Sequence, residues 1–102
     1  MTVEQTVDRL VQEVDDLLGV SSVGLYEFLE FLNTWDPSMP ADTKAAIARQ
    51  TLERVLAEDG VVMYRMRWPE SGNQGDVSLS DLPSDAWDTP SKNGWYIAVD
   101  RR

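Results

Sequence analysis

The sequence contains no cysteine and no histidine among its 102 residues. Without cysteine, the chain can form neither a disulfide nor a thiolate metal site. Without histidine, it also lacks the commonest general base near neutral pH and the Ser-His and Cys-His nucleophile systems. These two absences remove the usual zinc ligands and the most familiar catalytic groups. We therefore expect no catalytic residues, no bound metal and no cofactor.

Positive charge is also scarce. Nine Lys and Arg residues stand against 18 Asp and Glu, so the net charge is −9. A charge of this sign repels nucleic-acid phosphates and anionic membranes at long range. Residues 1–43 hold nine acids and one base (net −8), residues 44–68 hold three acids and five bases (net +2), and residues 69–102 hold six acids and three bases (net −3). Any cationic surface therefore has to come from the middle of the chain.

Long apolar runs are missing as well. No stretch approaches the ~20 consecutive apolar residues of a membrane span, and residues 1–5 lack the basic and then apolar order of a secretory signal. We expect a cytoplasmic protein with no membrane contact. The 42% hydrophobic and 26% charged residues are typical of a small globular protein. A chain of this length is expected to fold as one domain, residues 1–102, around one core.

Apolar residues at three- and four-residue spacings predict three helices, over about residues 3–18, 22–33 and 41–59. Thr2 and Gln5 fit a capping box at the start of the first helix, and Gly19 suits a left-handed residue at its end. Ser21 or Ser22 can cap the second helix. Pro37 and Pro40 predict a loop before the third helix, and Gly60 can end that helix.

Two later segments have the composition of strands. Residues 61–68 alternate between apolar and polar side chains, residues 95–99 are rich in strand formers, and the two should pair in antiparallel orientation. The loop 69–93 between them is long, polar and acidic. Residues 100–102 are expected to fray.

This order of helix, helix, turn, helix, strand, wing and strand resembles that of winged-helix domains, with residues 21–59 as the helix-turn-helix and 61–99 as the wing. The resemblance covers nearly the whole chain and rests on element order. It implies an α+β fold, a three-helix bundle followed by a two-stranded antiparallel wing. It also implies that the third helix could enter a DNA major groove. The basic side chains available for that contact are Lys44, Arg49, Arg54, Arg65 and Arg67.

Each of these cations also has a structural explanation. Arg49 lies one helical turn before Glu53, which is the spacing of an ordinary surface ion pair. Arg65 and Arg67 point to the same side of the first predicted wing strand. Charged side chains that face water on a small sheet commonly serve to prevent pairing between molecules.

The predicted wing offers a different kind of surface. Four acids and a tryptophan occur close together in it, and such a surface would suit a basic partner protein: Asp76, Asp81, Asp85, Trp87 and Asp88. The acids lack the spacing of a calcium loop. The four tryptophans have separate expected roles: Trp68 and Trp95 mostly buried, Trp87 anchoring the long loop, and Trp35 partly exposed.

These observations favour a small, acidic, non-enzymatic module that binds another protein with a basic surface, as immunity proteins and antitoxins do. An acidic scaffold that mimics DNA would use the same side chains and is not separated from this interpretation. The alternative is a winged-helix DNA-binding transcriptional regulator that uses the basic residues between 44 and 67.

Overall fold

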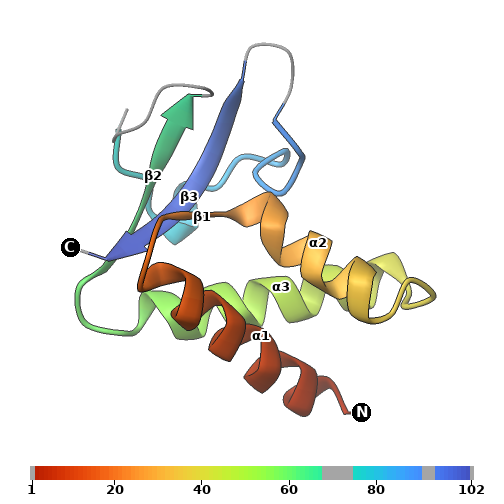
Figure 1. Ribbon diagram of the computed structural model, residues 1–102. Coiled ribbons are helices and arrows are strands. Elements are labelled where there is room, and N and C mark those ends of the chain that lie inside the picture. Colours follow the sequence, from red (N-terminus) through yellow and green to blue (C-terminus); the bar gives the residue numbers. More distant parts are fainter. Residues whose placement is uncertain (1, 68–74, 91–93, 102) are drawn as a thin grey trace.

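A computed structural model describes residues 2–67, 75–90 and 94–101 of the chain. Three helices pack against one face of a three-stranded antiparallel sheet (Figure 1). The fold class is α+β, as predicted, and the arrangement is compatible with a winged-helix-like fold. In chain order the elements are α1 (Val3–Leu18), β1 (Val23–Gly24), α2 (Leu25–Trp35), α3 (Ala41–Leu56), β2 (Val61–Arg67), η1 (Leu79–Asp81) and β3 (Trp95–Arg101).

The sheet has one strand more than the sequence predicted. Its order is β1-β3-β2, so the last strand in the chain is the central strand of the sheet. The additional strand, β1, pairs Val23 with Val99 and Gly24 with Ala98. The prediction of a two-stranded wing was therefore wrong, because two residues assigned to the second helix belong to the sheet.

The second helix begins at Leu25 and not near Ser22 because of a local hydrogen bond. The Glu27 carboxylate accepts a hydrogen bond from the Gly24 backbone N–H at 2.6 Å, which closes the first turn. The predicted cap Ser22 instead donates its hydroxyl proton to the sulfur of Met66 at 3.6 Å. The bond to Glu27 thus makes Gly24 the N-cap of α2, a residue that supplies no side-chain cap of its own.

The first helix agrees with its predicted bounds. The Thr2 N–H donates to Gln5 Oε1 at 2.9 Å and the Gln5 N–H to Thr2 Oγ1 at 3.1 Å, which confirms the capping box. The prediction for Gly19 was wrong, since its φ of −69° is right-handed. No left-handed residue is needed there because the Gly19 N–H already bonds to the Asp16 carbonyl at 3.3 Å.

The other two helices shift by a few residues. α2 runs to Trp35, past the predicted end at 33, because the Asp36 N–H still bonds to the Leu32 carbonyl at 2.9 Å. α3 ends at Leu56 and not at 59. The chain reverses into β2 at Gly60, whose φ of 80° is a conformation that favours glycine.

The end of the chain is better ordered than expected. β3 extends to Arg101, so the predicted fraying of residues 100–102 was wrong for the two residues that are described, and residue 102 lies outside the described ranges. Asp100 and Arg101 pair with Val62 and Val61 of β2. The Arg101 guanidinium lies 3.4 Å from an Asp15 carboxylate oxygen and 3.3 Å from one of Glu58. These partners hold the end of β3 against α1 and the turn after α3.

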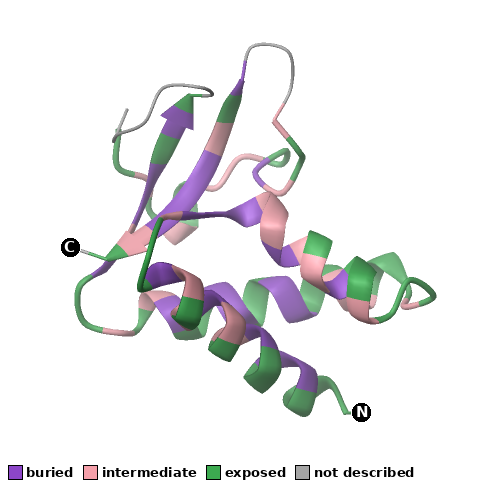
Figure 2. Ribbon diagram, in the orientation of Figure 1, coloured by how far each residue is buried: buried purple, intermediate pink, exposed green. Residues whose placement is uncertain are grey.

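The core lies between the helices and one face of the sheet. Figure 2 shows the buried faces of all three helices turned toward one another and toward the strands. The core side chains of the β2–β3 pair are Val61, Met63, Ile97 and Val99, alternate residues on one face of the sheet. The largest fully buried apolar side chains are Phe28, Leu10, Leu25, Leu32, Ile47 and Leu52.

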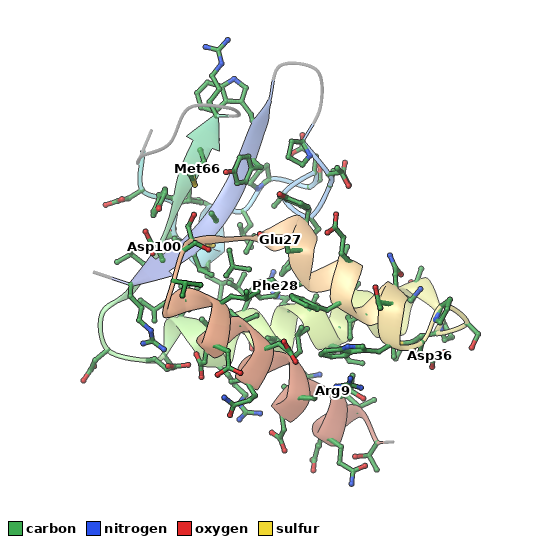
Figure 3. All side chains as sticks on the ribbon, viewed as in Figure 1. Arg9, Glu27, Phe28, Asp36, Met66 and Asp100 are labelled. Carbon is green, nitrogen blue, oxygen red and sulfur yellow. The ribbon has the colours of Figure 1, made fainter. Side chains whose placement is uncertain are left out.

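The opposite face of the sheet carries a smaller cluster built on Tyr64, Met66 and Ala98. Figure 3 labels Met66 and Asp100 on this face, away from Phe28 in the core. The Tyr64 hydroxyl donates to Asp100 at 2.8 Å. Burial together with this bond to a carboxylate raises the pKa of Tyr64 to about 12. The sheet is therefore apolar on both faces along its central part.

Candidate functional site

The predicted wing loop is not a simple hairpin connection. Residues 75–77 run along the outer edge of β2. The Arg65 N–H donates to the Gly75 carbonyl at 2.8 Å, and the Val77 N–H donates to the Met63 carbonyl at 3.0 Å. The segment thus extends the sheet by a short bridge between Tyr64 and Asp76. This pairing covers part of the edge that β2 would otherwise leave open.

Trp87 attaches the same segment to the core. Its ring centroid lies 5.8 Å from that of Phe28 in an edge-to-face contact, and Ala86 beside it is 6% exposed. Val77, Leu79 and Leu82 also pack against the core. The predicted anchoring role of Trp87 is confirmed. Its use as a contact for another protein stays a prediction, because the side chain is partly buried inside this one.

We call residues 75–90 the acidic segment. All four of its aspartates are exposed: Asp76, Asp81, Asp85 and Asp88. Asp81 accepts a hydrogen bond from the Ser78 hydroxyl at 2.7 Å, and the Asp88 N–H bonds to the Asp85 carbonyl at 3.0 Å. Because the bridge to β2 and the Trp87 contact hold the backbone, these carboxylates project from a fixed support.

The three cations of α3 are engaged within the chain. Arg49 Nε lies 3.4 Å from Glu53 Oε1, as predicted from their spacing. Arg54 forms an ion pair with Asp8 of α1. The Lys44 ammonium lies 3.4 Å from the Pro37 carbonyl. A DNA phosphate would have to compete with each of these contacts.

The two arginines of β2 are placed differently. Arg65 and Arg67 are exposed and point to the same side of the strand, as predicted. The Arg67 guanidinium carbon lies 5.6 Å from the ring centroid of Trp95. The prediction that Trp95 is mostly buried was wrong, since it is 42% exposed. Trp95 is the first residue of β3 and pairs with Arg67, the last residue of β2, at one end of the sheet.

The other two tryptophans of the chain are Trp35 and Trp68. Trp35 is partly buried, as predicted, although it belongs to α2 and not to a loop. The Arg9 guanidinium lies 3.9 Å from its ring centroid, close enough for a cation–π interaction between α1 and α2. Trp68 lies outside the described residues.

A hollow of about 310 Å³ opens between β3 and the acidic segment. We call it the Trp95 hollow. Its buried apolar floor is Ala86 and Ile97, and its exposed rim includes Arg65, Asp85 and Trp95. The sequence predicts separate surfaces for Arg65 and Asp85 and a mostly buried position for Trp95. Nothing in the spacing showed that the acidic segment returns under β3 and brings them together.

Asp15 is a carboxyl group whose pKa is strongly raised by its surroundings. Burial, a hydrogen bond with Glu58 and the negative charge of Glu58 raise the pKa of Asp15 from 3.8 to about 6, against the attraction of Arg101. Two carboxylates share one arginine here. Ionisation of Asp15 therefore costs the folded state free energy.

Replacing Asp15 by asparagine should stabilise the protein more as pH rises. The raised folded pKa means that Asp15 destabilises the fold only once it ionises, so its penalty is absent below pH 3.8 and complete above about 6. Because the side chain reaches solvent and Arg101 keeps Glu58 as a partner, we expect a gain of only about 1 kcal/mol at neutral pH. Urea unfolding of Asp15→Asn and the parent at pH 4 and pH 7 measures it. A gain of the same size at both pH values would contradict the assignment, and Asp16→Asn serves as control.

In the part of the chain that the structure describes, no cluster of Asp or Glu side chains has an arrangement that could hold a metal ion. Among the same residues, every helix is too short or too polar to cross a bilayer.

Comparison of the chain with protein-family models, with curated proteins and with solved structures finds no match in any of the three. Its function is therefore argued from its own geometry.

Proposed function

We propose that this protein is a non-enzymatic protein-interaction module whose acidic segment binds a basic surface of another protein. The observation that supports it most directly is the acidic segment itself, four exposed aspartates on a backbone held by Trp87 and by the bridge to β2. A net charge of −9 adds long-range attraction for a basic partner. The sharper form of the proposal is a neutraliser of the immunity or antitoxin type.

Rigid support matters for binding because association costs free energy whenever a loop must become ordered. Hydrogen bonds and packing already order the acidic segment in the isolated chain, so less of that cost remains to be met. Exposed charges at an interface mainly accelerate encounter and select the partner. We therefore expect fast, salt-sensitive association with a basic protein.

The test separates this surface from the rest of the negative charge. A photo-crosslinking residue at the exposed position Ser84 would capture the partner in the native cell, and the purified partner would then be titrated with two triple variants. Asp81→Asn, Asp85→Asn and Asp88→Asn together should slow association about tenfold at low salt. The matched control carries the same charge change on α1: Glu4→Gln, Glu13→Gln and Asp16→Asn. An equal decrease of the association rate in both triple variants, or a captured partner without a basic surface, would reject the proposal.

One observation favours a second candidate, a winged-helix DNA-binding regulator. Arg65 and Arg67 are exposed on one face of β2, and the element order is compatible with that fold. The contacts of Lys44, Arg49 and Arg54 within the chain count against it. The nearby aspartates of the acidic segment would also repel phosphates.

Random duplex DNA at low salt distinguishes the two candidates. We expect no binding in the micromolar range. Binding that weakens steeply with added salt, and that is lost when Arg49 and Arg65 are replaced by alanine, would put the DNA-binding function first.

A further inference from the structure

We propose that the Trp95 hollow binds a small zwitterion, namely an apolar α-amino acid or the equivalent end of a dipeptide. The ligand carboxylate would pair with Arg65 and its ammonium group with Asp85, while its apolar side chain would lie against Trp95 and the floor of the hollow. This inference concerns a different ligand from the protein partner proposed above and does not depend on that partner.

The register of the sheet brings the parts of this site together. Arg65 lies directly opposite Ile97 in the β2–β3 pair, and Trp95 is the next residue of β3 on the same face. Arg65 therefore lies beside Ile97 on the neighbouring strand, and Trp95 is the neighbour of Ile97 on the same face of β3. The acidic segment supplies the facing wall through Pro83, Asp85 and Ala86.

The charges on the rim indicate the kind of ligand. In the described part of the chain, no salt bridge joins Arg65 or Asp85 to each other or to any other residue. A nucleic acid in the hollow would meet the Asp85 carboxylate, and a cation would meet Arg65. A ligand with one positive and one negative group satisfies both, and guanidinium–carboxylate pairs are among the strongest charged hydrogen bonds.

The size and floor of the hollow limit the rest of the ligand. About 310 Å³ lies at the lower end of the ~300–1,000 Å³ usual for small-molecule sites, which suits one or two residues and not a longer peptide. Ile97 and Ala86 are 4% and 6% exposed, so the floor is apolar. The exposed indole of Trp95 adds a flat face for an aromatic or branched aliphatic side chain.

Calorimetric titration with four compounds tests the charge pattern. L-Phenylalanine and glycyl-phenylalanine carry both charges, N-acetyl-phenylalanine lacks the ammonium group, and phenethylamine lacks the carboxylate. We expect at least one of the first two to bind, and each single-charge compound to bind roughly tenfold more weakly or less. The tighter of the two zwitterions identifies the source as a free amino acid or a peptide end.

Variants assign each charge to its residue. Arg65→Met should weaken the binding of L-phenylalanine about tenfold and remove its preference over phenethylamine. Asp85→Asn should weaken the binding of L-phenylalanine by a similar factor and remove its preference over N-acetyl-phenylalanine. Arg49→Met and Asp88→Asn are matched controls outside the hollow and should leave binding unchanged. Circular dichroism shows that each variant is folded. No heat from either zwitterion at millimolar concentration with the folded parent, or equal affinity for all four compounds, would overturn the proposal.

The two proposals fail separately. If L-phenylalanine binds and the Asp81, Asp85 and Asp88 triple variant still associates normally with the captured partner, only the protein-binding function is rejected. If the triple variant loses the partner while the parent binds no zwitterion, only the inference about the Trp95 hollow is rejected.

Discussion

Replacing Phe28 by alanine should lower the free energy of unfolding by about 3–5 kcal/mol, the usual cost of removing a buried phenylalanine. Phe28 is 0% exposed and contacts Trp87, so its loss leaves a cavity where α2 meets the acidic segment. Urea unfolding followed by circular dichroism measures the change. A small domain has only about 5–15 kcal/mol in total, so the variant should be visibly less stable at room temperature.

Phe31, on the same helix but only partly buried, provides the control. Phe31→Ala should cost clearly less, because less apolar area leaves water when Phe31 folds. Phe28→Leu keeps the test valid if Phe28→Ala does not fold. It removes less volume, so its free energy of unfolding should lie between those of the parent and of the alanine variant. Equal losses for Phe28→Ala and Phe31→Ala would mean that the core is not centred on Phe28.

Replacing Trp87 by alanine should release the acidic segment from the core. We expect a loss of about 2–3 kcal/mol, below that of a fully buried tryptophan because Trp87 keeps part of its surface in water. The more specific effect concerns one amide. The Val77 N–H, bonded to the Met63 carbonyl at 3.0 Å, should exchange with solvent much faster once the segment detaches.

Hydrogen exchange read by NMR measures this effect, with Trp35→Ala as control. Trp35 is also partly buried but contacts α1 and not the acidic segment, so its loss should leave the Val77 amide protected. If Trp87→Ala lowers stability without accelerating exchange at Val77, the bridge to β2 holds the segment without help from the tryptophan. In that case the rigid support invoked for protein binding would rest on the bridge alone.

Local signals in the sequence were sufficient for most of the helical layer. The spacing of apolar residues between 3 and 18 and the Thr2–Gln5 box determine α1, because both depend only on neighbours within two turns. The same holds for the Arg49–Glu53 pair. What could not be predicted involves partners distant in sequence. Val23 and Gly24 are strand residues only because Val99 and Ala98 lie beside them.

The candidate site divides in the same way. The aspartates of the acidic segment could be found by composition, and the anchoring by Trp87 followed from its size and apolar character. Trp95 could not be placed, because alternation along a strand says which face a residue takes but not how far the helical layer reaches beneath it. The Trp95 hollow was missed for the same reason, since its two walls come from segments with no local signal to join them.

The position of β3 at the centre of the sheet has a consequence for synthesis on the ribosome. Of the three strands, β1 and β2 each pair with β3 and not with each other, so the three-stranded sheet cannot form until residues 95–101 have emerged. The three helices and β2 have already been translated by then. Val61 and Met63 of β2 still lack their partners in β3, Arg101 and Val99. Late, long-range pairing of this kind slows folding and leaves hydrophobic, aggregation-prone surface exposed in the meantime. A nascent chain halted before residue 95 should therefore be the state of this protein that most needs a chaperone.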